Sequence, residues 1–480
     1  MIGIEVLLLF GVVTLLTYCI KYFWNRRRLY ELARNLPGHD GLSFIDSIKF
    51  LTQISKKDYI SKLLNFIKDE APLTKVWLFN HCFIITKDAR IINKIFYTPE
   101  TYNKPSLLYR IFSKNHALPS LNGNEHKRHR KIINKAFTTK ILQQLLNTFD
   151  EKSKKIILKI DENVDSGEFE LMDYVGVYSL ESFGKSNLSY ETDYFHSELF
   201  DAFYKYMESS MDFMPYLVVG LSHKLLDFLN LGGEHGKIMR SIQKYMDDVI
   251  KSNKAQDDKS ENSLINLMLD PKFEFTKEEI DDELAMTTIA SFDTTSRTIS
   301  TILMMLGIHH NVQQKVMTEI DEVYSTQTQP DFSLDFLQKF TYLESVIKES
   351  MRLFPEGPFI AREPSDDVDI NGYLIPKGAV ILISIFGMHR DEKYWGSDAH
   401  LFKPERFLED LKFSFAFAPF SGGKRICIGY RYAMNSMKIF LINFLRNYKV
   451  DCSTKFEEIE TEVSLALSFV NGYKVSLERR

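Results

Sequence analysis

The sequence predicts a mainly α-helical protein with small β-sheets, preceded by one N-terminal transmembrane helix. Apolar residues recur at three-and-four spacing over most of the chain, whereas runs with strand character are short and few. The first twenty residues form a nearly continuous apolar run. Beyond the first forty residues, the 480-residue chain contains no repeat and no linker rich in Pro, Gly and Ser. We therefore expect one large folded body.

Residues 1–21 are predicted to be a membrane anchor. The run from Ile2 to Ile20 is long enough to cross a bilayer as a helix. Lys21 and three arginines at positions 26–28 follow it, and such basic residues stay on the cytoplasmic side, which places the rest of the chain in the cytosol. The alternative is a cleaved signal peptide. It is disfavoured because the basic cluster follows the apolar run instead of preceding it.

Residues 22–40 are predicted to form a basic hinge with a stiff Pro-Gly turn, and residues 41–480 the folded domain. Within that domain, runs rich in β-branched and aromatic residues predict strands at 76–79, 83–86 and 380–384. Helical periodicity predicts helices at 126–149, 236–252, 276–309, 310–324, 334–353 and 428–446.

Composition excludes several classes of protein. With 44% hydrophobic residues, 26% charged residues and a net charge of -4, the chain is neither disordered nor a nucleic-acid-binding protein. Its four cysteines are too few and too scattered for a disulfide scaffold, and none are spaced as Cys-x-x-Cys. We therefore expect a reducing environment and no nucleic-acid partner.

One cysteine lies in a glycine-rich segment, Phe-Ser-Gly-Gly-Lys-Arg-Ile-Cys-Ile-Gly at 420–429, directly before a predicted helix. A cysteine thiolate is a strong donor to haem iron. Glycines allow the backbone to approach a flat macrocycle, and the helix N-terminus lowers a thiol pKa. Arg425 suits a haem propionate, and Phe420 can shield the sulfur of Cys427 from water. The alternative is a buried structural cysteine in a turn.

Phe420, Gly423, Arg425, Cys427 and Gly429 match every fixed position of the haem-binding loop of the cytochrome P450 superfamily, which the chain resembles. A chance match in this composition is on the order of one in ten thousand. The resemblance implies the cytochrome P450 fold and haem b as cofactor, with the sulfur-iron bond of Cys427 as its only covalent attachment.

The resemblance also implies a function. Enzymes of this kind insert one oxygen atom from O2 into a lipophilic substrate, with electrons from NADPH delivered by a flavoprotein reductase and in some cases by a b-type cytochrome. The chain resembles microsomal animal enzymes, near the fatty-acid hydroxylase group. We therefore expect a single-pass protein of the endoplasmic reticulum membrane with its catalytic domain on the cytosolic side.

An acid and a base three residues apart, Glu349 and Arg352, share one face of the predicted helix at 334–353. With Arg406 in the later segment Pro-Glu-Arg-Phe, the resemblance implies a buried ion network that holds the cysteine loop in place. Such a network specifies one structure more than it adds net stability, because burying charges is costly.

The helix predicted at 276–309 contains Ala290-Ser291-Phe292-Asp293-Thr294, which resembles the family's oxygen-binding pattern except at Ser291, where glycine is usual. An acid beside a hydroxyl can relay protons, and Asp293 and Thr294 are the predicted catalytic pair. The alternative is that both bond only to the helix backbone. Some relatives attach haem covalently through a glutamate at the position of Ala290, so alanine predicts non-covalent haem.

Further basic residues are predicted to contact the haem propionates. His126 and Arg130 share a helix face, with His126 replacing the family's usual tryptophan, and Arg362 resembles another propionate ligand. A basic docking face for the reductase is predicted from Lys127, Arg128, Lys131, Lys135, Lys424, Arg431 and Lys438. A solvated helix face is the alternative.

The substrate is predicted to be lipophilic. Segments 106–121, 195–231, 354–360 and 465–470 are rich in Phe, Tyr, Leu and Met, including Met207, Met211, Phe213, Met214 and Tyr216. Apolar walls favour a fatty acid, terpenoid, hydrocarbon or xenobiotic, although the same residues suit an ordinary core. Two other functions stay open: a haem-thiolate isomerase or dehydratase of the same fold, and a low-turnover haem protein that acts as a ligand sink.

Overall fold

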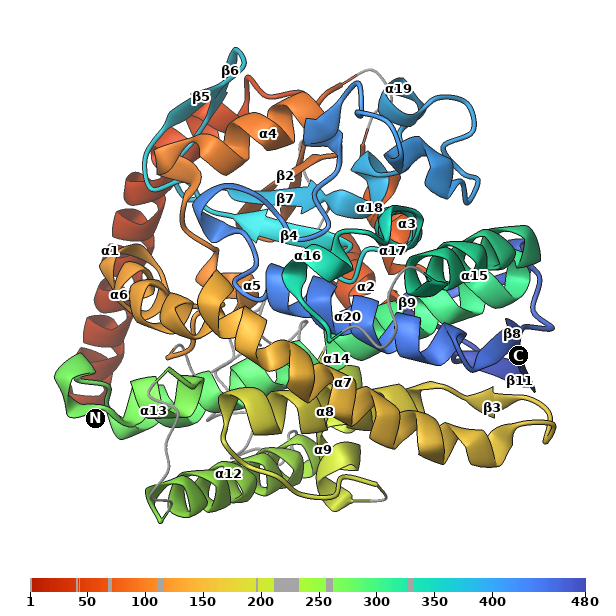
Figure 1. Cartoon of the computed structure of the whole chain (residues 1–480). Coiled ribbons are helices and arrows are strands. Elements are labelled where there is room, and N and C mark those ends of the chain that lie inside the picture. The colour runs from red at the N-terminus through yellow and green to blue at the C-terminus, as the bar shows by residue number, and fades with distance from the viewer. Residues whose placement is uncertain are drawn as a thin grey trace.

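The computed structural model describes residues 2–39, 42, 44–67, 71–109, 116–195, 197–210, 233–255, 262–325 and 331–480. It is mainly helical with small sheets, as predicted (Figure 1). The longer helices are α1 (Ile2–Ala33), α2 (Phe44–Gln53), α6 (Gly123–Ile133), α7 (Thr139–Ile160), α8 (Met172–Asn187), α9 (Glu198–Ser210), α12 (Gly233–Lys254), α14 (Lys277–Ile308), α15 (His310–Ser325), α17 (Thr341–Leu353) and α20 (Tyr430–Leu445). The shorter helices are α3 (Tyr59–Leu64), α4 (Ala89–Tyr97), α5 (Ser106–Tyr109), α13 (Leu264–Leu269), α16 (Leu334–Leu337), α18 (Ile385–Met388) and α19 (Glu392–Trp395).

The largest sheet has four strands in the order β1 (Thr74–Leu78), β2 (His81–Thr86), β7 (Val380–Ser384) and β4 (Phe359–Arg362). β2 and β7 pair in parallel, and the other pairs are antiparallel. All three predicted strands lie in this sheet. Three smaller sheets are formed by β3 (Phe169–Glu170), β11 (Lys474–Arg479) and β8 (Tyr448–Asp451), by β5 (Val368–Ile370) and β6 (Tyr373–Ile375), and by β9 (Thr461–Val463) and β10 (Leu467–Phe469).

Two predicted helices are each divided into two separate helices. The helix predicted at 126–149 is divided into α6 and α7, because Thr138 is extended (φ -69°, ψ 154°) and α7 begins after it. The helix predicted at 334–353 is divided into α16 and α17 by the non-helical residues 338–340, of which Phe340 has φ -89° and ψ 73°. Periodicity misses such breaks, because the apolar face continues across them.

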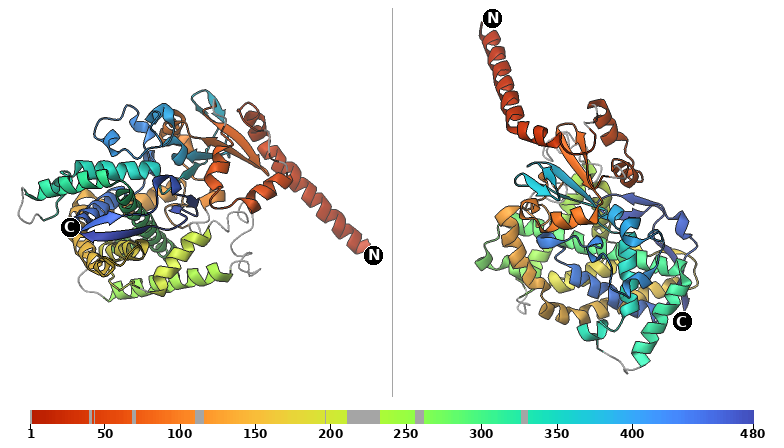
Figure 2. Two further views of the ribbon diagram at one scale, coloured as in Figure 1. Left: turned by 90° about the vertical axis from the view of Figure 1, so that its right-hand side faces the viewer. Right: turned by 90° about the horizontal axis from the view of Figure 1, so that it is seen from above.

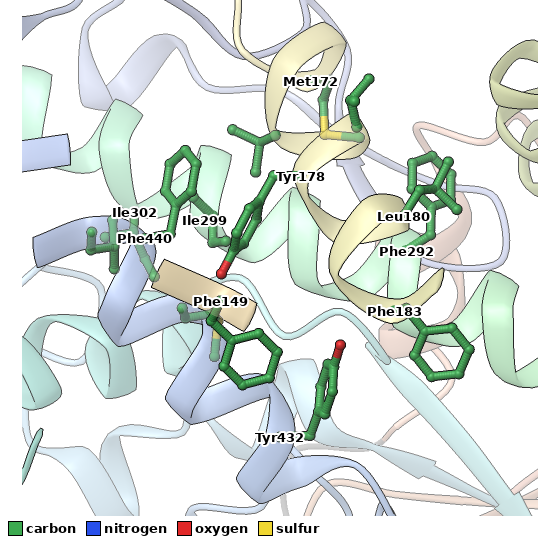
Figure 3. Packing of buried hydrophobic residues seen from close by; sticks show 14 of the residues in the cluster. Phe149, Met172, Tyr178, Leu180, Phe183, Phe292, Ile299, Ile302, Tyr432 and Phe440 are labelled. Atoms are coloured by element: carbon green, nitrogen blue, oxygen red, sulfur yellow. The ribbon is translucent and has the colours of Figure 1, made fainter. Parts of the chain in front are cut away.

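α14 crosses the middle of the molecule, where α8 and α20 pack against it (Figure 1). Figure 3 shows the contact region, in which Ile299 of α14 lies near Tyr178 of α8 and Phe440 of α20, and Phe292 of α14 lies near Leu180 of α8. Tyr178 also donates a hydrogen bond to the Ser436 carbonyl oxygen at 3.0 Å. Residues 292–307 of α14 are almost entirely buried, so this part of the helix is held on all sides.

α1 continues without interruption across the predicted boundary between residues 21 and 22. Its C-terminal end packs on the body through Leu29 and Ala33, whereas the N-terminal end projects away from it (Figure 2). The projecting part exposes large apolar side chains: Val12, Val13, Leu16, Ile20, Phe23 and Trp24. A search of the described residues finds no helix with the length and apolar character of a membrane span.

Candidate active site

Cys427 lies between a turn of 3-10 helix, η8 (Gly423–Arg425), and the N-terminus of α20. Its backbone N–H donates to the Phe420 carbonyl oxygen at 2.9 Å. The side chain is exposed, yet burial raises the pKa of the thiol, against the opposing effects of the Gly429 N–H and the charge on Arg130. Both observations hold if the sulfur faces an internal space enclosed by protein. The thiol is therefore accessible to a ligand held inside the molecule.

The glycines of this loop allow it to pack against the end of α4. Gly423 has φ +64°, and a Cβ added there would lie 2.0 Å from the Phe96 carbonyl oxygen. A Cβ on Gly422 would lie 2.4 Å from the Phe96 ring. The sequence interpretation gave these glycines a role in making room for a macrocycle. The contact that requires them in this structure is with Phe96.

Gly423→Ala is expected to lower the free energy of unfolding by about 2 to 4 kcal/mol, because the new residue is strained at positive φ and collides with a backbone oxygen. Thermal unfolding monitored by circular dichroism measures the change. Gly429→Ala is the matched control in the same loop, since its φ is -90° and its added Cβ comes only within 4.0 Å of Phe137. Equal decreases in the free energy of unfolding of the two variants would show that neither the positive φ nor the contact with Phe96 determines the effect of Gly423→Ala.

Arg425, predicted to contact a haem propionate, is held in place through two of its three guanidinium nitrogens. Nε donates to the Tyr102 carbonyl oxygen at 3.0 Å, and Nη2 to the Leu121 carbonyl oxygen at 2.7 Å. Nη1 is buried and has no hydrogen-bond partner among the described residues. A buried guanidinium N–H without a partner is costly, so this atom marks a place where an acceptor belongs.

Arg130 and Arg362, the other two arginines predicted to bind propionates, also reach the cysteine loop. Arg130 Nη1 donates to the Ile426 carbonyl oxygen at 2.8 Å, and Arg362 Nη2 donates to Ser421 Oγ at 3.0 Å. Arg362 is almost fully buried. No ion pair between the three arginines and a carboxylate is found in the described part of the chain.

Sequence reasoning missed Lys104, a fourth cation of this cluster. Asn122 holds its backbone with two hydrogen bonds, at 2.9 Å and 2.8 Å. Burial and then the charges on Arg362 and Arg425 hold the pKa of Lys104 well below its usual range, while Cys427 acts in the opposite direction. No local pattern marks Lys104, because only the tertiary fold brings it to the arginines. A buried group of cations without protein anions fits a dianionic ligand such as haem with its two propionates.

His126 is buried, and its Nδ1 forms a hydrogen bond with the Tyr102 hydroxyl. Burial, followed by the charge on Arg425, lowers the pKa of His126 to about 2. The imidazole is therefore neutral at physiological pH. The contact of His126 with a propionate stays a prediction, since a neutral imidazole can also donate one hydrogen bond.

Ala290 and Thr294 lie one turn apart on α14, and Ala290 is exposed although it lies within a largely buried helix. Thr294 Oγ1 donates to the Ala290 carbonyl oxygen at 2.8 Å, which is the backbone bond considered as the alternative to a relay. Ser291 makes a similar bond to Thr288. Asp293 is fully buried and accepts from Arg297 Nε at 2.7 Å. This ion pair was not foreseen from the sequence.

The predicted ion network is present. Arg352 forms a bidentate ion pair with Glu349 at 2.7 and 2.8 Å, and Arg406 Nε lies 3.1 Å from the same carboxylate. Arg352 also donates to the carbonyl oxygen of His389 at 2.8 Å. His389 Nε2 accepts from the Ala418 N–H at 2.9 Å, two residues before the cysteine loop. The network therefore reaches the loop through His389. Its role in holding the loop stays a prediction.

The described structure tests some of the remaining predictions. Lys438 is buried and bonds to Glu344, and Arg128 pairs with Glu279, so neither is a free surface cation, and the prediction is wrong for Lys438. The exposed residues of the predicted docking face are Lys127, Lys131, Lys135, Lys424 and Arg431.

Of the predicted substrate-lining segments, residues 110–115, 196 and 211–231 lie outside the described residues, and so do Met211, Phe213, Met214 and Tyr216.

Residues 37–474 match the model of the cytochrome P450 family, and the chain therefore belongs to this family. It is a haem-thiolate monooxygenase, an oxidoreductase whose cofactor is haem b with a cysteine thiolate as the iron ligand. It is 29% identical to "Probable cytochrome P450 313a1" of Drosophila melanogaster over 507 residues, covering 100% of both chains. It is 28% identical to "Cytochrome P450 4V2" of Homo sapiens, covering 95% of this chain and 91% of that protein.

Proposed function

We propose that this protein inserts one oxygen atom from O2 into a lipophilic substrate, with NADPH as the electron source and a flavoprotein reductase as the donor. The observation that carries the proposal is the thiol of Cys427, which is enclosed by the fold and close to Arg130 and Lys104. It lies within a group of cations that form no ion pair with a carboxylate in the described part of the chain. A resemblance near the fatty-acid hydroxylases favours a fatty acid or a similar aliphatic lipophile as substrate.

Specific residues would hold the haem. Cys427 would ligate the iron, and the Gly429 N–H stabilises negative charge on its sulfur. Arg425, through its free Nη1, and Lys104 would bind propionate oxygens, with Arg130 and Arg362 beside them. When bound, the haem supplies the iron centre at which dioxygen is activated.

Asp293 and Thr294 would relay the protons that this chemistry consumes. Among the described residues, the Thr294 hydroxyl bonds only to its own helix. Its oxygen has acceptor lone pairs left over, so it can accept one hydrogen bond while donating another. Asp293 lies next to it in the chain, with one carboxylate oxygen on Arg297 and the other without a partner among the described residues. Such a pair can pass a proton along by rearranging short hydrogen bonds.

The reductase would bind the exposed cations of α6, α20 and the cysteine loop. Lys424 and Arg431 lie within four residues of Cys427 in the chain, and Lys127 lies 5.9 Å from the Tyr102 ring. An acidic partner surface would be steered toward these exposed charges. A b-type cytochrome would use the same surface. Electron transfer from the reductase should then weaken as ionic strength rises.

We also propose that α1 anchors the protein in the endoplasmic reticulum membrane as a single pass, with the body in the cytosol. The support is the set of exposed apolar side chains, such as Leu16 and Trp24, on the part of α1 that projects from the body, followed by the arginines at 26–28. Deletion of residues 1–21 should release the protein from microsomes treated with alkaline carbonate. Full retention of the shortened protein would reject this anchor.

The function is tested on purified protein that is reduced under carbon monoxide and then supplied with reductase, NADPH and isotopically labelled O2. We expect the thiolate-type Soret band and labelled oxygen in the product of one member of a lipophile panel. A product formed from a peroxide without O2 or reductase would favour the isomerase or dehydratase. A thiolate band with no product from any substrate would favour the ligand sink.

The same preparation tests the predicted non-covalent attachment of haem. Extraction with acidified organic solvent should remove all of the haem, because Ala290 has no carboxylate with which to form an ester. Haem that stays on the denatured protein would contradict the prediction.

A further inference from the structure

A second buried acid, Glu356, lies beside α14 in the segment between α17 and β4. Its carbonyl oxygen accepts from the Leu467 N–H at 3.0 Å, which fixes the backbone against β10. Its Oε1 lies 3.2 Å from Thr298 Oγ1. Its Oε2 is buried and has no hydrogen-bond partner in the described part of the chain. Glu356 belongs to none of the motifs found in the sequence.

Glu356 and Asp293 share one guanidinium. Arg297 is buried and forms its ion pair with Asp293 at 2.7 Å, and its charge also acts on Glu356. If both acids were ionised, this dry cluster would carry a net negative charge, which is costly. Among the described residues, Tyr204 of α9, Glu170 of β3 and Tyr473 also face the cluster, and none of them adds a positive charge. Lys56 is a cation of the adjoining cavity wall, and its ammonium group bonds to the Glu208 carbonyl oxygen.

To avoid this cost, one of the two acids keeps a proton. Asp293 has the direct ion pair with Arg297, so the proton belongs on Glu356. The hydrogen bonds of Thr298 lead to the same assignment. Its hydroxyl has one hydrogen and lies 2.8 Å from the Thr294 carbonyl oxygen, which accepts it. The contact with Glu356 is then a full hydrogen bond only when a Glu356 O–H donates to Thr298. In agreement, burial raises the pKa of Glu356 well above its usual range.

A polar cavity of about 380 Å³ reaches this cluster from the surface. Arg297 and Tyr473 line its inner end, and Glu208 and Glu462 are among the acidic residues of its wall. Glu356 itself does not line the cavity, and Arg297, which does, is the residue that connects the cavity to both acids. Water in such a polar cavity can reach Arg297.

We propose that Glu356 is a second proton carrier of this enzyme, which lies beside Arg297 and exchanges a proton with Asp293. In each cycle the O–H bond of Glu356 breaks, and its proton moves to Asp293, whose Oδ2 has no partner among the described residues. The resulting Glu356 carboxylate is protonated again by a water molecule that enters from the cavity past Arg297, and a proton from solvent neutralises the hydroxide that is left. The inference rests on the relay proposed above. Glu356 acts through Asp293 and is a positioning residue.

Infrared spectroscopy of the full-length haem-loaded protein tests the location of the proton. The wild type should show the carbonyl band of a protonated carboxylic acid at neutral pH, shifted in D2O, and Glu356→Gln should remove that band. Asp293→Asn should also weaken it, because Arg297 is then free to pair with an ionised Glu356. The matched control is Glu283→Gln, which replaces another buried acid of α14 with a raised pKa and should leave the Glu356 band in place. A wild type without this band, or a band that survives Glu356→Gln, overturns the assignment.

Turnover with NADPH and reductase tests the role in proton transfer. Glu356→Gln should lower product formed per NADPH about tenfold, and Glu356→Asp, which keeps an acid, should restore part of it. The proposal is wrong if Glu356→Gln and the wild type form the same amount of product per NADPH and show the same solvent isotope effect on turnover. Thr294→Ala separates the two proposals. If this variant forms as much product per NADPH as the wild type, the relay in the proposed function is wrong. The location of the proton on Glu356 then still stands if the infrared band is lost in Glu356→Gln.

Discussion

Replacing Cys427 by alanine is expected to abolish product formation and the thiolate-type Soret band of the reduced carbon monoxide complex. A thiolate pushes electron density onto haem iron and favours cleavage of the O–O bond, and alanine supplies no ligand. The loop itself should persist, because the bond from the N–H of residue 427 to the Phe420 carbonyl oxygen does not need the side chain.

Cys452→Ala is the matched control for this experiment. Cys452 is a half-buried free thiol near the Lys474 carbonyl oxygen, outside the cysteine loop. Its replacement should leave both the absorption spectrum and turnover unchanged. Unchanged spectrum and turnover in Cys427→Ala would instead refute the assignment of the iron ligand and the mechanism built on it.

The sequence was informative wherever one local stretch carries the signal. The segment from Phe420 to Gly429 is such a stretch, and so are the long amphipathic helices and the strand at 380–384. The break at Thr138 could not be predicted in this way, because one extended residue leaves the apolar periodicity intact. Its φ and ψ depend on how α6 and α7 pack on the rest of the protein.

The parts of the site that sequence reasoning missed depend on contacts between distant segments. Lys104 and Glu356 belong to no motif, and each gains its properties from residues far away in the chain. Lys438 looks like a surface cation because charged residues are usually exposed, but Glu344 and the Leu337 carbonyl oxygen hold it in the interior. Arg297 could be recognised as a neighbour of Asp293 at i+4. Its burial, which makes the pair strong, is a property of the fold.

Arg352→Ala is expected to give little haem-loaded protein. The change removes the bidentate ion pair with Glu349 and the hydrogen bonds to the carbonyl oxygens of His389, Ala399 and Leu401. Glu349 is then left buried with Arg406 as its remaining cation. Breaking a buried pair in this way costs about 3 to 5 kcal/mol, a large share of the stability of a typical protein. The haem-to-protein ratio and the midpoint of thermal unfolding measure the loss.

Lys403→Ala separates this buried network from ordinary surface pairing. The Lys403 side chain pairs with Asp398 at 3.0 Å on the surface, while its backbone N–H bonds to Glu349 and survives the substitution. An exposed pair contributes about 0 to 1 kcal/mol, so haem content should stay normal in this control. Arg352→Lys should behave like Arg352→Ala, because an ammonium group cannot reproduce the two parallel bonds to Glu349 together with three carbonyl contacts. Normal haem incorporation in Arg352→Ala would show that the cysteine loop holds its shape without the network, and the path through His389 to Ala418 would then have no part in binding haem.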